Sequence, residues 1–183
     1  MKTAFDIEQL IDAGSITNEL DYERAMIADR KLRLLAKENP HFKKKRSRLR
    51  SIIAAYEKKE WNKHTVATAA KLAESHQAEQ LAESERLFIE NRAARIKKEL
   101  KALDLTQEQL AAVLGHKSKT HMSELINGVK PFQLTDLLVI SKLLKIDMKT
   151  LIPPFLSATD RTKVLSALQQ LNNPRLEKRA LTF

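Results

Sequence analysis

The chain is poor in the residues that crosslink or sharply bend a polypeptide. Its 183 residues include no cysteine, three glycines and a 5% share of aromatic residues. Without cysteine it forms no disulfide and no thiolate metal site. Three isolated glycines leave no glycine-rich loop that could cradle phosphates. Few glycines and few aromatics are typical of a helical protein with few tight turns, so we expect an all-α fold.

Long apolar runs are also missing from the sequence. No segment approaches the roughly 20 apolar residues that span a bilayer, and the N-terminus has no signal-peptide pattern. We therefore expect a soluble, cytoplasmic protein with no membrane partner. None of the histidines sits in a metal-binding or catalytic motif, so we expect no metal, no cofactor and no enzyme activity. The histidines are His41, His64, His76, His116 and His121.

Positive charge, in contrast, is abundant and unevenly distributed. The net charge is +10, with +7 carried by residues 41–63 and +4 by residues 94–156. Separate basic blocks indicate a phosphate-binding surface built from several segments. The same bias also suits a soluble protein that has no nucleic-acid partner, and charge alone does not distinguish the two.

The spacing of apolar residues divides the chain into four parts. Residues 1–62 predict an N-terminal helical lobe, whose two long helices are separated by Asn39-Pro40. Residues 63–93 are rich in Ala, Glu and Gln and predict a long helical linker. Residues 94–156 predict a domain of about five helices, and residues 157–183 predict a last helix with a basic tail.

The functional signal lies between residues 96 and 153. Thr106 and Gln109 have the spacing of a capping box that begins a helix, and Gly115 can end that helix. Ser118 is the expected cap of the next helix, which ends at an Asn-Gly pair. A short helix, a tight turn and a second helix with a polar outer face form a helix-turn-helix, which lays its second helix in the DNA major groove.

Polar residues at the start of that second, recognition helix are the expected base contacts. Their side chains should point outward, while Met122, Leu125 and Ile126 point inward. Phosphate contacts are expected at the start of the preceding helix, which presents free backbone N–H groups, and just after the recognition helix. The expected DNA-binding residues are Thr106, Gln107, Lys117, Ser118, Lys119, Thr120, His121, Glu124 and Lys130.

Two stretches of this domain resemble the XRE-like (Cro/repressor-type) helix-turn-helix family. They are LTQEQLA at residues 105–111 and SELING at residues 123–128. The resemblance implies binding to double-stranded operator DNA. Between Gly115 and Ser123 the chain is one residue longer than is usual in that family, which leaves open which of residues 117–120 begins the recognition helix.

The N-terminal half adds a narrower resemblance. The segments ITNELDYERAM at residues 16–26 and RSIIAAYEKKEW at residues 50–61 are similar to the N-terminal region of HigA-type antitoxins. In those proteins this region precedes an XRE-like domain with a segment similar to LINGVKPFQLTDL, here residues 125–137. The resemblance implies the antitoxin of a type II toxin–antitoxin module, which forms a homodimer, neutralises a small basic ribonuclease toxin and represses its own operon.

Two other functions remain open at this point. The chain could be a repressor without a toxin partner, or a helical scaffold or RNA-binding protein that uses residues 43–50 as its main contact. If there is a toxin, the acidic side of the helix over residues 19–37 is its expected docking surface, unless these acids only cap and solvate the helix. A dimer could use either the N-terminal lobe or the helix at residues 159–171. The expected toxin-binding residues are Glu19, Asp21, Glu23 and Asp29.

Overall fold

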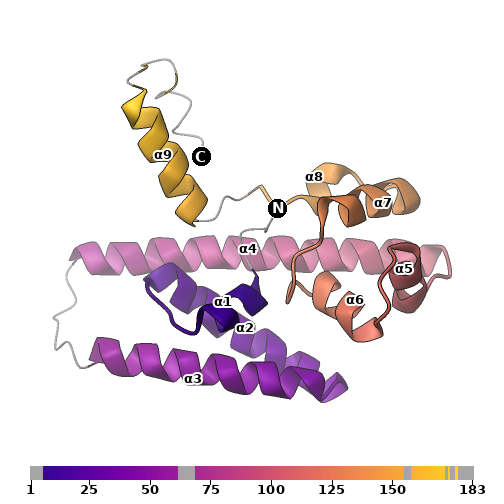
Figure 1. Ribbon diagram of the computed structural model, residues 1–183, viewed down its shortest axis with the longest axis horizontal. Helices are drawn as coiled ribbons and strands as arrows, with labels where there is room; N and C mark the ends of the chain where they lie inside the picture. Colours follow the sequence, from indigo (N-terminus) through magenta and orange to yellow (C-terminus); the bar gives the residue numbers. More distant parts are fainter. Residues whose placement is uncertain (1–5, 62–68, 155–157, 172, 174–175, 177–183) are drawn as a thin grey trace.

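The computed structural model describes residues 6–61, 69–154, 158–171, 173 and 176. These residues form nine helices and no strand (Figure 1), which confirms the expected all-α fold. No helix in the described part of the chain is both long and apolar enough to cross a membrane. The helices are α1 (Ile7–Ala13), α2 (Glu19–Glu38), α3 (His41–Trp61), α4 (Ala69–Ala102), α5 (Gln107–Val113), α6 (Lys119–Ile126), α7 (Leu134–Leu144), α8 (Met148–Leu151) and α9 (Ala158–Gln170).

Helices α1, α2 and α3 form an N-terminal lobe around a core of its own. The side chain of Asn18 caps α2 by accepting from the backbone N–H of Asp21, and Asn39 ends the helix next to a proline, as expected. After this turn α3 runs back along α2, with α1 laid across the pair (Figure 1). The buried residues of the lobe are Ile7, Ile11, Ile16, Ala25, Ala28, Leu32, Leu35, Phe42, Leu49 and Ile53.

The expected linker and the first helix of the DNA-binding domain are one continuous helix, α4. Its N-terminal half lies along α2 and buries the small side chains of Ala78 and Ala82, which allow the two helices to approach closely. Its C-terminal half carries Ile96 and Leu100 into a second core. The two halves of α4 therefore belong to two different cores, and the N-terminal lobe lies against the linker instead of being held away from it.

A buried ion pair joins α2 to α4. The Arg24 Nε lies 2.8 Å from the Glu85 Oε2, and a second guanidinium nitrogen binds the other carboxylate oxygen. Both residues are 5% exposed or less. Burial alone lowers the pKa of Arg24, but the hydrogen bonds and the charge of Glu85 outweigh it and raise the pKa. A bidentate pair has a fixed geometry, so it holds the lobe in one orientation on α4.

The second core lies between the C-terminal half of α4 and helices α5 to α8. Gly115 follows α5 with a φ of +76°, a left-handed conformation that glycine adopts without strain. Helix α9 follows this domain in the chain and lies apart from the other helices (Figure 1). The buried residues of the second core are Ala93, Ile96, Leu100, Leu110, Ala111, Met122, Leu125, Ile126, Phe132, Leu137, Ile140, Leu144, Ile146 and Leu151.

Candidate nucleic-acid interface

Side-chain caps fix where the two helices of the helix-turn-helix begin. At the start of α5, the Thr106 Oγ1 accepts from the backbone N–H of Gln109 at 3.1 Å, and the Gln109 side chain accepts from the backbone N–H of Thr106 at 2.8 Å. This is the expected capping box. At the start of α6, the Ser118 hydroxyl accepts from the backbone N–H of His121. The recognition helix therefore begins at Lys119, with Ser118 as its cap.

The exposed start of α6 and its buried apolar residues agree with expectation, whereas Thr120 and His121, also expected to point outward, are half-buried. Lys117, Ser118 and Lys119 are exposed, and the three apolar residues Met122, Leu125 and Ile126 are buried in the domain core. The start of the helix thus presents a hydroxyl and two lysines, groups that can donate to phosphates or to base edges.

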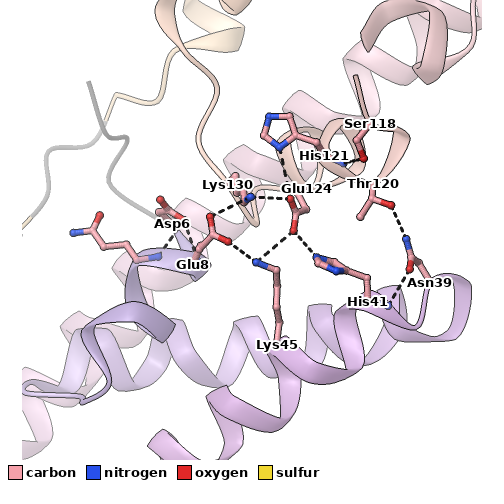
Figure 2. Close-up of polar contacts among 11 residues, drawn as sticks. Asp6, Glu8, Asn39, His41, Lys45, Ser118, Thr120, His121, Glu124 and Lys130 are labelled. Atoms are coloured by element: carbon pink, nitrogen blue, oxygen red, sulfur yellow. Dashed lines mark hydrogen bonds and ion pairs between the residues drawn. The ribbon is translucent and has the colours of Figure 1, made fainter. Parts of the chain in front are cut away.

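Glu124, expected on the outer face of α6, is buried, and that expectation is wrong. It is 3% exposed because side chains from outside α6 surround its carboxylate (Figure 2). Its Oε1 lies 3.0 Å from the His41 Nε2 and 3.4 Å from the Lys45 Nζ, both on α3, and its Oε2 lies 3.2 Å from the Lys130 Nζ. His121 also lies close, with its Nδ1 3.7 Å from Oε2. The carboxylate is therefore an anchor for the N-terminal lobe.

The electrostatics of Glu124 match that role. Burial alone raises the pKa of its carboxyl, but hydrogen bonds from His41 and Lys130 and the charge of Lys45 outweigh it, and the pKa is lowered. The same carboxylate raises the pKa of Lys130 against the effect of burial. The charged forms of both groups are thus favoured in this arrangement.

Two further expected DNA contacts are engaged by the N-terminal lobe. The Asn39 side-chain amide donates to the Thr120 Oγ1 at 3.1 Å, and its oxygen accepts from the backbone N–H of His41 (Figure 2). The Lys130 Nζ lies 3.4 Å from a carboxylate oxygen of Glu8 on α1. Polar side chains of the lobe thus bind polar groups of the recognition helix and of the turn that follows it.

The turn after α6 also joins the apolar core of the lobe. Val129 is fully buried among the core residues of the N-terminal lobe, and its carbonyl accepts from the backbone N–H of Glu8 at 3.2 Å. Gly128, with a φ of +72°, is so close to α4 that a Cβ there would lie 2.7 Å from Ile89. Sequence reasoning missed Val129. The only signal was an apolar residue in a turn expected to be exposed.

Three of the other expected contacts face a hollow between the domain and α2. Thr106, Gln107 and Lys119 line it on one side, and Lys31 and Leu34 of α2 line it on the other. Its volume is about 580 Å³. An α-helix with its side chains is about 10–12 Å wide and fills a major groove of about 12 Å. In this arrangement Thr120 and Glu124 of α6 are bound to the lobe and are not free for such a contact.

The acidic residues expected to receive a toxin are mostly bound within the chain. Glu19 accepts from Tyr56 and Ser75, Asp21 accepts from Arg24, and Asp29 accepts from Arg46. Glu23 has no partner among the described residues. Burial, with the neighbouring charges of Glu19 and Glu79, raises the pKa of the Glu23 carboxyl. Of the four, Glu23 alone makes no hydrogen bond or ion pair with the described residues, and the charge of Arg30 offsets its raised pKa only in part.

One known protein family matches the domain just described. Residues 96–151, from the last turns of α4 through α8, match a family model described as Helix-turn-helix. No curated protein and no solved structure matches the chain. The match covers the two capped helices, the turn between them and the core that holds them. Residues 96–151 are therefore an XRE-like helix-turn-helix domain, the fold of DNA-binding regulators.

Proposed function

We propose that the chain is a transcription regulator that binds operator DNA through α6 and whose N-terminal lobe controls access to that helix. One observation carries the proposal: Glu124, Thr120 and Lys130, three expected DNA contacts, are all held by the lobe. In this closed arrangement the lobe covers part of the recognition helix, while Lys119 at its start stays exposed. Binding to an operator requires an open arrangement in which the lobe has moved away from α6.

The free energy needed to move the lobe away from α6 is within what DNA binding can supply. Extracting Val129 from the lobe core costs roughly 1.5–3 kcal/mol, and the partly exposed polar contacts around Glu124 add a few kcal/mol at most. Specific DNA complexes are about 4–10 kcal/mol more stable than non-specific ones. A correct operator therefore supplies enough free energy to open the lobe, whereas non-specific DNA does not.

Two matched substitutions on α3 test this control. Lys45 lies 3.4 Å from Glu124, whereas its neighbour Lys44 is exposed and has no acidic partner among the described residues. Lys45→Met and Lys44→Met remove the same charge, so they change long-range attraction to DNA equally. We expect Lys45→Met to bind a selected operator duplex several-fold more tightly than Lys44→Met, measured by fluorescence anisotropy.

Two outcomes of that experiment separate the parts of the proposal. Equal affinities of Lys45→Met and Lys44→Met would show that the lobe contact does not limit binding. Lys119→Ala combined with Thr120→Ala should weaken operator binding while leaving the fold intact. If this double variant binds like the unmodified chain, α6 is not the helix that reads the operator.

A second candidate function is the antitoxin of a type II toxin–antitoxin module. Two observations favour it: the N-terminal lobe carries the HigA-like segments at residues 16–26 and 50–61, and the same lobe contacts the recognition helix. A ribonuclease bound to the lobe would then change operator affinity, and DNA would change toxin affinity by the same factor. Such a protein would act as a homodimer on a palindrome with half-sites about 34 Å apart.

Co-expression with the product of the adjacent gene tests the antitoxin function. A stable complex that stops the partner from cleaving RNA supports it, and we expect Glu23→Lys to weaken capture because a basic partner would balance the charge at that site. Asp29→Lys is a poor probe, since Asp29 already binds Arg46. If no complex forms and operator binding is intact, the chain is a regulator without a toxin partner.

A further inference from the structure

The clearest surface not used by the helix-turn-helix is a basic groove between α2 and α3. Five cationic side chains line it: Arg33 and Lys37 from the last turns of α2, and Lys43, Arg46 and Arg50 from the first turns of α3. Its volume is about 850 Å³, and most of its cationic side chains are exposed. It lies next to the α2–α3 turn, whose Asn39 contacts Thr120 of the recognition helix.

The charge of this groove is not balanced within the chain. Arg46 binds Asp29, with its Nε 2.9 Å from the carboxylate. Arg33, Lys37, Lys43 and Arg50 are exposed, and no acidic side chain of the described residues lies within ion-pair distance of them. Like charges on facing helices repel one another, so an anion in the groove would lower the free energy of the whole arrangement.

The position of the charges on α3 adds to this imbalance. The first turn of α3 contains no acidic residue, and its cations begin at Lys43. A helix N-terminus carries partial positive charge, so basic residues there oppose the helix dipole. The same dipole favours negative charge from a ligand at this end of the groove.

We propose that the basic groove binds the phosphate backbone of duplex DNA without regard to sequence. Lysine, arginine and serine are the side chains that contact phosphate oxygens, and Ser47 and Ser51 complete the lining on α3. Single strands are bound with aromatic platforms that stack the bases, and no aromatic residue lines this groove. The assignment to DNA, as opposed to another duplex, rests on the proposed function of the helix-turn-helix domain.

The cations of the groove stay exposed while the lobe holds Thr120 and Glu124 of α6, and this gives the groove a distinct role. In the closed arrangement the chain can hold non-specific DNA through the groove alone. When the lobe moves away from α6, this helix becomes accessible to a DNA duplex that the groove already holds. Sequence-independent contacts of this kind supply most of the non-specific affinity and allow a protein to slide along DNA.

The test compares two triple variants of the full chain that lose the same charge. Lys37→Gln, Lys43→Gln and Arg50→Gln together remove three groove cations. Lys58→Gln, Lys59→Gln and Lys163→Gln together remove three exposed lysines that lie outside the groove lining. Binding to a 30-base-pair duplex of random sequence is measured by anisotropy at several salt concentrations, and circular dichroism checks that both variants fold.

The expected result is specific to the groove. Each phosphate contact contributes about 0.9 to the slope of log K against log salt, so the groove variant should lose roughly 2–3 from that slope and at least about tenfold in affinity. The control variant should keep the slope of the unmodified chain. Equal slopes and affinities for the two variants would overturn the proposal.

Two more outcomes distinguish this inference from the function proposed above. If a single strand of the same length binds as tightly through the same three residues, the assignment to duplex DNA is wrong. If Lys119→Ala and Thr120→Ala leave operator binding unchanged, α6 does not recognise the operator. Binding to the random duplex still tests the groove in that case. The two proposals can therefore fail separately.

Discussion

The N-terminal lobe touches the rest of the chain in two places that differ in chemistry. Against α4 it places α2, which packs beside the buried Ala78 and Ala82 of α4 and joins it through the buried Arg24–Glu85 pair. Against α6 it presents polar side chains around Glu124. On this second side the Glu124 carboxylate is buried, but its partners His41 and Lys130 are 48% and 28% exposed, so water reaches the edge of the contact.

This difference in burial indicates which of the two contacts can break while the chain stays folded. A buried bidentate pair is costly to break, because either partner alone would be an uncompensated charge in the interior. Exposed ion pairs contribute little, because water replaces them readily and salt screens them. We infer that the lobe stays on the N-terminal half of α4 and moves, when it moves, at its α6 side.

The largest expected effect lies at the buried pair between α2 and α4. Glu85→Ala leaves Arg24 buried without its main partner, so we expect the free energy of unfolding to fall by about 3–5 kcal/mol. The control is Arg86→Ala, one residue along α4, which removes a partly exposed cation bound to Glu83 and Glu90. That change should cost about 1 kcal/mol or less. Urea denaturation measures both, and equal losses would contradict the comparison.

An intermediate effect is expected at Val129, the apolar part of the α6 contact. Val129→Ala removes two methyl groups from the lobe core, which weakens the closed arrangement by about 1.5 kcal/mol. Since 1.4 kcal/mol is a factor of ten in an equilibrium constant, operator affinity should rise up to tenfold. Ile53→Val is the control, because Ile53 lies in the same core but on α3. It should lower stability without raising operator affinity. If operator affinity rises in both variants, or in neither, the Val129 contact does not control DNA binding.

The sequence predicted the parts of the site that short-range chemistry determines. The caps at Thr106 and Ser118 and the left-handed Gly115 depend on side chains within a few residues of each other, so their positions follow from local pattern. The helical character of residues 69–93 followed from their composition. The inward side of α6 followed from its spacing of apolar residues.

The errors come from contacts between distant segments. Glu124 was expected to face outward because α6 alone offers it no partner, and its partner His41 lies 83 residues earlier. Residues 63–93 predicted a linker because they are rich in Ala, Glu and Gln, yet the small side chains of Ala78 and Ala82 are what close packing against α2 requires. Polar residues on one helix do not reveal whether DNA or another part of the chain will cover them.

The smallest effect at neutral pH is expected inside the lobe, away from α6. The chain has two tyrosines, Tyr22 on α2 and Tyr56 on α3, and their rings stack with centroids 5.1 Å apart. Burial, with a hydrogen bond to Glu57, raises the pKa of Tyr22 to about 12. Burial, with the charge of Glu19, raises the pKa of Tyr56 to about 12.

These raised pKa values determine how stability depends on alkaline pH. The folded state holds the two phenolic protons more tightly than the unfolded state, whose tyrosines titrate near 10. Their contribution to the free energy of unfolding is therefore complete below pH 10 and is lost as the pH rises from 10 to 12. Tyrosinate absorbance should show both groups titrating near 12 in the folded chain and near 10 in denaturant, and Tyr56→Phe should halve the signal. Titration of either tyrosine near 10 in the folded chain would mean that the contact between α2 and α3 is open. The lobe would then not move as the single unit on which its release from α6 depends.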